Sequence, residues 1–487
     1  MDRDEGAFDI VLESTGLVES IAAAALSKAG FKVAHLDPNP HYGAAEASLS
    51  FEELIAWQSS PPQWLLSILP LSRHNRPTTL ILALSFPISN PVHWSSHRRT
   101  RRVRCVQIRR FPSCGTRSKE DVFKNKDISL VEKRRLMRFL QFAAGEFEGK
   151  KELEGHAENP FPEYLRSVFS LNEEMTNAIA YALAYCLSPN DATLPALHRL
   201  RRYLRSSGRY GASPFLVGHY GSSGEIAQGF CRTAAVSGGV YILGRKIESI
   251  DSTQPATHTI RLEEFPEPIT ASLFISSSRP GATLIPPPTE LSAPFSSSSP
   301  AYTVARCIAI VDKPILFNAA PEPSEEDAYP TEPVATDTGV IVFPPSSLPE
   351  GGSTTASATV LISGEGTMSC PKGKWIVYIS LPSSESDPQT LLKPYLDATL
   401  ALAGSPEPLF STYYFQHPTV APSGDVPGAP LLAPTPLPPI LPLPDAGDAA
   451  AVYAEGVFWT AVRRLGQEDN VTGFWPPMEE RDADVED

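Results

Sequence analysis

Cysteine is scarce in this sequence, and no two cysteines have the spacing that a zinc ribbon or a disulfide-rich scaffold requires. The 487 residues contain six cysteines without a C-x-x-C motif. Long apolar runs are also missing. The most apolar stretch, residues 64–87, is broken by Pro70 and Pro77, so we predict no membrane-spanning helix. The acidic amino terminus lacks the basic region of a signal peptide, and we expect a cytosolic protein.

Basic charge is in short supply as well. Lysine and arginine number 41 against 55 aspartates and glutamates, which gives a net charge of −14. Because a face that binds phosphate must be basic, this balance argues against general nucleic-acid binding. The sequence contains no H-E-x-x-H motif, nucleophile elbow or Walker loop. We therefore predict neither a metal centre nor a catalytic residue.

Proline, by contrast, is abundant, with 49 of 487 residues against a usual share of about 5%. Much of the excess lies in three stretches, residues 277–300, 319–355 and 418–444. Because proline lacks a backbone N–H and fixes φ, we expect surface loops there, without helices or inner strands. A fourth stretch, 61–112, is an anomalous basic segment with seven arginines between positions 98 and 110. We interpret it as an error in the gene prediction or a loop, with a basic binding patch as the alternative.

The first forty residues have the pattern of a nucleotide-binding β-α-β unit. A buried strand is predicted over 8–12, a helix with an alanine-rich face over 17–29, and a second strand over 31–36. Such a unit opens a FAD/NAD(P)-binding, Rossmann-like fold. We therefore predict the α/β class, in an α+β two-domain arrangement.

The phosphate loop of this unit departs from the G-x-G-x-x-G pattern, because its three glycine positions hold Ser14, Gly16 and Glu19. A side chain at Ser14 hinders the tight turn, and the Glu19 carboxylate repels phosphate at the start of the helix. Asp37 does lie about 20 residues after the turn, where such folds bind a ribose hydroxyl. We predict a Rossmann-like fold that no longer binds a dinucleotide and has no cofactor. A flavin-dependent oxidoreductase is the alternative.

Two blocks of sequence resemble one protein family. The first comprises 8–11, 15–20 and 37–43, and the second comprises 208–216, 224–232 and 238–241. Both resemble the Rab GDP-dissociation inhibitor and Rab escort protein family. Two further stretches, 118–140 and 366–373, resemble the escort branch more than the inhibitor branch.

The resemblance implies a platform for the switch regions of a GDP-bound Rab GTPase. Its residues, matched by motif, are Tyr42, Glu225, Gln228 and Arg232, with Ile242 as an apolar neighbour. An internal ion pair between Glu225 and Arg232 is the structural alternative. One departure is the pair at 222–223, two serines where the family has a single residue, and the extra residue could shift Glu225.

The resemblance further implies a non-catalytic accessory component of Rab geranylgeranyltransferase. The expected partners are GDP-bound Rab, the transferase heterodimer, a geranylgeranyl lipid and, transiently, a membrane. Residues 1–58 and 208–487 would form the Rossmann-like, Rab-binding domain. Residues 118–207 would form a smaller all-helical domain that shelters the lipid, although the apolar helical stripe there indicates from the residues alone only a core. A Rab GDP-dissociation inhibitor that recycles Rab from membranes is the alternative within the family.

Overall fold

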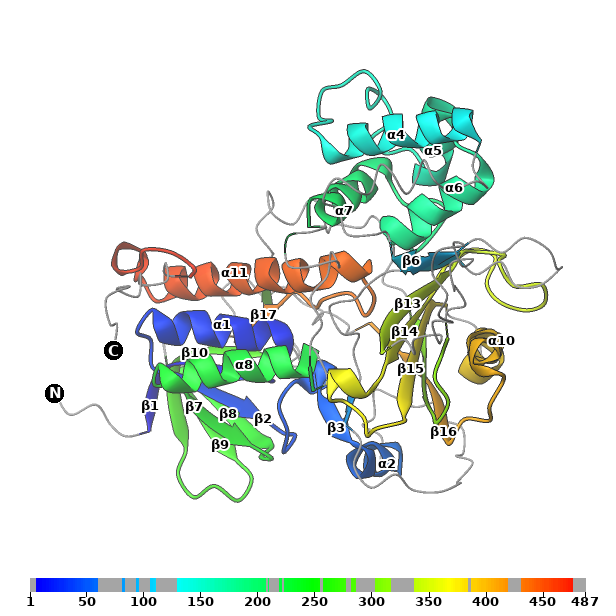
Figure 1. The fold of residues 1–487 in the computed structure, drawn as a ribbon. Helices are drawn as coiled ribbons and strands as arrows, with labels where there is room; N and C mark the ends of the chain where they lie inside the picture. Colours follow the sequence, from blue (N-terminus) through cyan, green and yellow to red (C-terminus); the bar gives the residue numbers. More distant parts are fainter. Residues whose placement is uncertain are drawn as a thin grey trace, which may run out of the picture.

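A computed structural model describes residues 6–59, 81–83, 93–95, 106–110, 129–206, 209, 219–220, 223–254, 257–276, 282–285, 303–316, 337–383, 387–418 and 431–475. These residues form a parallel-sheet unit, an antiparallel-sheet unit and a helical unit (Figure 1). The helical unit stands over the antiparallel sheet, while three long helices cover the parallel sheet (Figure 1). The predicted Rossmann-like domain with a smaller helical domain is confirmed.

The parallel-sheet unit is built around the predicted β-α-β entry. Strand β1 lies between β10 and β2 and pairs in parallel with both, and β10 also pairs antiparallel with β9. The strands, in sheet order, are β11 (Thr283–Ile285), β17 (Leu431–Pro434), β10 (Ile269–Ser276), β1 (Ala7–Glu13), β2 (Val33–Asp37) and β7 (Val240–Leu243), with β9 (Thr257–Leu262) and β8 (Ile247–Gln254) branching from β10. Both faces of β2 are buried, as in an inner parallel strand, and the burial includes the polar His35 and Asp37.

Three helices stack on one face of this sheet: α1 (Leu17–Lys28), α8 (Ser223–Val236) and α11 (Ala446–Arg464) (Figure 1). Helix α1 lies between the other two and is buried on nearly every side. Its four consecutive alanines, 22–25, have no exposed surface. Small side chains let the neighbouring helices approach closely, which explains why α1 is rich in alanine rather than amphipathic.

The antiparallel-sheet unit is a seven-stranded sheet that the sequence did not predict as a separate layer. Helix α10 (Pro388–Leu400) covers one face through Leu392, Tyr395 and Leu396. The other face packs against the helical unit. The strands, in sheet order, are β16 (Phe410–Gln416), β12 (Val304–Val311), β15 (Trp375–Pro382), β14 (Ala358–Ser363), β13 (Thr338–Phe343), β6 (Val106–Arg110) and β5 (His93–Ser95).

The helical unit begins at a capping box, in which Ser129 and Glu132 satisfy each other's backbone N–H groups. The predicted stripe of α4 is confirmed: Leu136, Phe139 and Ala143 are buried, while Leu140 is half-buried against the same core. The elements of the helical unit are α4 (Leu130–Ala144), α5 (Phe161–Phe169), α6 (Glu173–Asn177), the π-helical η2 (Ala178–Leu183) and α7 (Thr193–Ser206).

Short elements connect the three units. The turn η1 (Ala44–Glu46) leads into β3 (Ser48–Ser50) and α2 (Phe51–Ser59), and β3 pairs with β4 (Ile81–Ala83). The remaining short helices are η3 (Glu365–Thr367), η4 (Ala401–Ala403), η5 (Leu443–Asp445) and η6 (Glu468–Asn470).

The expectation that proline-rich stretches exclude inner strands was wrong. Strand β13 lies within 319–355, is buried along its whole length and is paired on both sides. Strand β17 lies within 418–444, between β10 and β11, and β11 itself lies within 277–300. A window rich in proline can still contain four to six consecutive residues that suit a strand. Pro434 is the last residue of β17, a position that a proline can occupy.

The basic segment 61–112 also contributes structure. Three short strands fall within it, and β6 and β5 extend the antiparallel sheet beyond β13. Most of the remaining residues of that segment lie outside the described part of the chain.

Candidate functional site

The turn between β1 and α1 keeps the backbone of a phosphate loop although it has lost the first glycine. Ser14 has φ of 86°, the left-handed region that favours glycine. Its N–H donates to the carbonyl of Leu36 at 2.8 Å, and its Oγ accepts from the N–H of Gly16 at 3.3 Å. These two bonds compensate for part of the strain of a side chain at this position.

Two carboxylates occupy the start of α1, where a dinucleotide fold holds pyrophosphate. Glu46, which ends η1, accepts a hydrogen bond from the N–H of Leu17 at 3.3 Å. A Cβ placed on Gly16 would lie 2.7 Å from Glu19 Oε2 and 3.6 Å from Glu46 Oε2. Burial raises the pKa of Glu46 to about 7, against an ordinary value of 4.5. The positive end of the helix dipole is thus used by side chains of the chain itself.

Asp37, which ends β2, is likewise engaged within the protein. Its Oδ2 accepts from the N–H of Thr15 at 2.8 Å and from the Thr15 hydroxyl at 2.6 Å. Its Oδ1 accepts from the backbone and side-chain nitrogens of Asn39 at 2.8 and 2.9 Å. Both oxygens that would meet a ribose are therefore satisfied. A pyrophosphate and a ribose do not fit the residues present at this turn.

The loop after β2 places Tyr42 above the sheet. Gly43, at φ of 100°, donates to the Thr15 hydroxyl at 3.0 Å and so fixes the loop to the turn. The Tyr42 ring meets Tyr241 of β7 edge-on, with centroids 5.7 Å apart. Tyr241 also contacts His35, which donates to the Ser14 carbonyl; burial lowers the pKa of His35 to about 4, so it stays neutral.

Helix α8 presents three of the predicted residues on one face. Glu225, Gln228 and Arg232 are spaced i, i+3 and i+7, so they form a single stripe. Gln228 and Arg232 are exposed, and Glu225 is half-buried, which raises its pKa. Within the described residues no ion pair joins Glu225 to Arg232, which lie two helical turns apart. We call Tyr42 and these three residues the α8 surface.

The position of α8 is set by its buried side and by a close approach at its start. Ala227, Cys231 and Ala234 face α1 and are buried. A Cβ on Gly224 would lie 2.5 Å from Ser48 Oγ and 2.6 Å from the Glu46 carbonyl oxygen. Only glycine allows the first turn of α8 to lie against the η1–β3 backbone in this way.

Tyr241 connects Tyr42 to α8, and the sequence reasoning missed it. Burial raises the pKa of both tyrosines, and the nearby Cys231 thiol raises it further. Successive residues of a strand face opposite sides of the sheet. Tyr241 therefore packs with the helices, whereas Ile242 packs with the cluster on the opposite face, beside Leu36. The structure brings the other four predicted residues to the helix side and leaves Ile242 on the far face.

In the described parts of the chain, no three His, Cys, Asp or Glu side chains lie close enough together to hold a metal ion. No helix there is long and apolar enough to cross a bilayer. Residues 210–218 and 221–222, within or next to the second family block, lie outside the described residues. They include Ser222, one of the two serines at 222–223.

Curated relatives resemble the chain over most of its length. It is 28% identical over 412 residues to Rab proteins geranylgeranyltransferase component A of Saccharomyces cerevisiae, covering 78% of this chain and 63% of that protein. The protein of the same description from Candida albicans is 26% identical, covering 76% and 59%. Rab GDP dissociation inhibitor beta of Rattus norvegicus is 27% identical over 260 residues, covering 50% and 57%. The chain thus spans less than two thirds of the length of these relatives.

A solved structure and a family model agree with this. The Rab GDI of Plasmodium falciparum superposes with a TM-score of 0.59 at 18% identity, covering 94% of this chain and 98% of that one, which shows the same fold. The family model described as GDP dissociation inhibitor matches residues 1–63 and 106–324 and passes over 64–105. That match includes more than half of the residues, and the chain belongs to the GDP dissociation inhibitor family.

Proposed function

We propose that this protein is a Rab escort protein. It binds GDP-bound Rab through the α8 surface, presents it to the Rab geranylgeranyltransferase heterodimer and delivers the lipidated product to membranes. The observation that supports this most is the exposed polar stripe of α8 beside Tyr42. In addition, 78% of this chain is similar to a protein named as a component of that transferase. Cytosolic localisation, with transient membrane contact, is part of the proposal.

The α8 surface has the chemistry of a protein-binding site. Arginine and tyrosine dominate interface hot spots because they combine large contact area with hydrogen-bonding groups. In the described structure the Arg232 side chain has no hydrogen bond or ion pair, so its five donors are available to a partner. The side chain of Ile242 lies on the other face of the sheet. It can contact the same partner only if that partner reaches around the exposed edge strand β7.

The cofactor position supports an accessory role rather than catalysis. Glu46 and Glu19 lie at the start of α1, and the Asp37 carboxylate already accepts hydrogen bonds from Thr15 and Asn39. A flavin would have to displace these groups and lie against two carboxylates. The flavin-dependent oxidoreductase is therefore the weaker alternative, and a stoichiometric yellow chromophore in the purified protein would revive it.

The helical unit is the proposed shelter for the geranylgeranyl lipid. Its core is aromatic, with Phe139, Phe142, Phe161, Tyr164 and Phe169 in mutual ring contact. Among the described residues, the Tyr164 hydroxyl is buried and has no hydrogen-bond partner. A buried hydroxyl without a partner is costly, and this makes the packing around Tyr164 easier to rearrange than a fully satisfied core.

A reconstituted prenylation assay separates escort protein from inhibitor. The reaction contains GDP-loaded Rab, the transferase heterodimer, geranylgeranyl diphosphate and this chain. We expect lipid incorporation to depend on the chain and to fall with Arg232→Ala, while Arg463→Ala, an exposed arginine at the end of α11, leaves it unchanged. Extraction of lipidated Rab from membranes without support of prenylation would instead establish the recycling inhibitor.

A further inference from the structure

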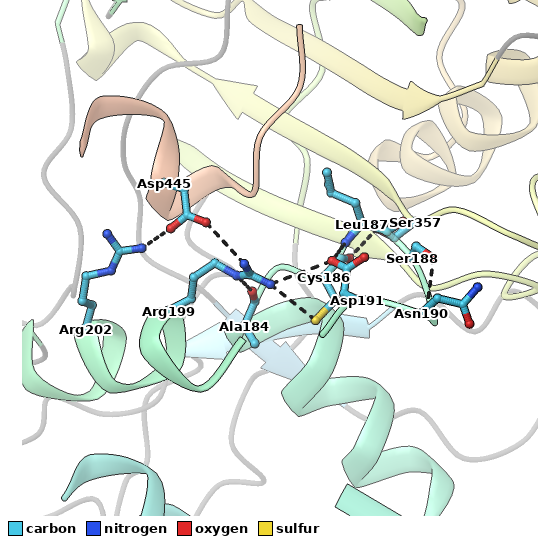
Figure 2. A network of polar contacts seen from close by, with 10 residues as sticks. All are labelled: Ala184, Cys186, Leu187, Ser188, Asn190, Asp191, Arg199, Arg202, Ser357 and Asp445. Carbon is cyan, nitrogen blue, oxygen red and sulfur yellow. Dashed lines mark hydrogen bonds and ion pairs between the residues drawn. The ribbon is translucent and has the colours of Figure 1, made fainter. Parts of the chain in front are cut away.

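Arg199 of α7 is a buried arginine whose guanidinium contacts three separate segments (Figure 2). Its Nε donates to the carbonyl oxygen of Ala184, just after η2, at 2.5 Å. Its terminal nitrogens reach Asp445 Oδ2 at 3.3 Å and Asp191 Oδ2 at 3.8 Å. Because only 4% of Arg199 is exposed, its charge depends on these partners rather than on water.

Asp445 is a buried point at which α7 is tied to the parallel-sheet unit, and Arg202 of α7 also pairs with Asp448 in the first turn of α11. Asp445 ends η5, lies immediately before α11 and is 2% exposed. One of its oxygens accepts from Arg199 and the other accepts from Arg202, one turn further along α7 (Figure 2). Burial raises the pKa of Asp445, and the two arginines oppose that rise. We call Arg199, Arg202 and Asp445 the latch.

The latch supplies charged, directional contacts to a joint that is mainly apolar. The helical unit packs on the antiparallel sheet through side chains such as Leu361 and Tyr378. Apolar contacts of this kind have no preferred angle, so they permit small rotations. Charge-assisted hydrogen bonds between a planar guanidinium and a carboxylate define both distance and direction. The latch also reaches α11, which packs on α1 and thereby on the layer that contains the α8 surface.

The segment that the latch holds has a conformation that its sequence does not favour. Residues 178–183 form a π-helix, which is rare and is often found at functional sites. Tyr185 follows with φ of 51°, an unusual value for a bulky residue. Arg199 binds the carbonyl between them, and Ser357 of the antiparallel-sheet unit binds the Cys186 carbonyl at 2.8 Å. Strain of this kind persists only where surrounding contacts enforce it.

We propose that the latch sets the orientation of the helical unit relative to the α8 surface, and that this orientation is needed to hold a lipidated Rab at both places at once. The inference rests on the proposed function. An unlipidated Rab contacts the α8 surface alone and does not require the latch. A lipidated Rab is a bivalent ligand, and its second contact contributes only if the geometry allows both to form.

The test compares Asp445→Asn with Arg201→Gln. Arg201 lies on the same helix, but it pairs with Glu146 and Glu148 and packs on Phe147, all within the helical unit. Arg202→Met serves as a milder latch variant, since it leaves the buried Arg199–Asp445 pair in place. Hydrogen exchange of residues 184–206 is measured on the full chain without Rab. Affinities are then measured for unlipidated and geranylgeranylated GDP-bound Rab.

We expect Asp445→Asn to speed exchange of 184–206 by about 10-fold or more and to lower affinity for lipidated Rab by about 10-fold. Affinity for unlipidated Rab should stay within about twofold, Arg202→Met should show a smaller effect in the same direction, and Arg201→Gln should match the native chain. Unchanged exchange, or equal losses for both Rab forms, would overturn the latch. If the native chain binds neither form of Rab, the proposed function is wrong. The proposed role of the latch in binding lipidated Rab is then wrong too, even if Asp445→Asn speeds hydrogen exchange of residues 184–206.

Discussion

At the scale of single residues, Ser14 tests whether the old phosphate turn is still under constraint. A β-branched side chain tolerates φ of 86° poorly, so Ser14→Val should lower the free energy of unfolding by about 2 kcal/mol or more. Ser14→Gly should change it by less than about 1 kcal/mol, because relief of strain is offset by the greater backbone entropy of glycine. Urea unfolding of both variants measures the difference. Equal effects would mean that the turn is not strained.

Glu46 predicts an unusual dependence of stability on pH. Its pKa is raised in the folded state to about 7 from 4.5, so the folded chain binds more protons than the unfolded chain between these values. Its contribution to stability is therefore lost as the pH rises from about 4.5 to 7. Glu46→Gln keeps an acceptor for the Leu17 N–H and avoids the charge.

We expect Glu46→Gln to match the native chain near pH 4.5 and to be more stable at pH 8 by about 2 kcal/mol, less than the full linkage because the side chain retains some contact with solvent. Thermal unfolding across this range, with Glu468→Gln on the exposed η6 as control, provides the comparison. A gain that is the same at every pH would show that the Glu46 carboxyl is not held protonated.

At the scale of elements, two glycines of α8 have opposite roles. A Cβ on Gly224 meets the backbone of η1 and β3, whereas a Cβ on Gly229 meets no atom of the described residues within 4 Å. Gly224→Ala should therefore destabilise the protein by about 2 kcal/mol or more and displace Glu225. Gly229→Ala, in the middle of the helix, should stabilise it by about 0.5–1 kcal/mol. Both values follow from denaturant midpoints, and a stable Gly224→Ala protein would show that the contact is not close.

Elements governed by local periodicity could be predicted from the sequence. The strand, helix and strand at the amino terminus and the buried stripe of α4 lie where expected. Strands β13 and β17 could not, because a proline-rich window conceals a short run such as residues 338–343. Strand β14 follows β13 closely, but the other pairing partners, β6, β10 and β11, lie far away in the sequence. Pairing determines whether such a run becomes an inner strand.

The candidate site shows the same division. Tyr42 and the α8 stripe follow from motif and helical spacing. The side of the sheet that Tyr241 and Ile242 face depends on strand register, which the motif does not specify. The carboxylate of Glu46 reaches α1 across 29 positions, and Arg199 meets Asp445 across 246. Contacts of that kind appear only when the chain is folded.

At the scale of the whole molecule, the proposed function predicts a preference for one nucleotide state of Rab. The switch regions of a GTPase are ordered by the γ-phosphate and loosen after hydrolysis. A platform that fits the looser form should bind GDP-loaded Rab at least about 10-fold more tightly than GTP-loaded Rab, a difference of about 1.4 kcal/mol. Titration of one Rab in both states measures the ratio. Equal affinities would contradict the assignment of the α8 surface to the switch regions.

The central claim is that α8 and Tyr42 form the surface that binds GDP-bound Rab, and the affinity of Arg232→Ala for GDP-loaded Rab tests it most directly. The Arg232 side chain is exposed and makes no hydrogen bond or ion pair in the described structure, so the melting temperature should barely change. Rab affinity should fall about 30-fold, or about 2 kcal/mol, and Tyr42→Ala should behave similarly in binding. Arg463→Ala should leave affinity unchanged. A folded Arg232→Ala protein that binds GDP-loaded Rab as tightly as the native chain would contradict the claim.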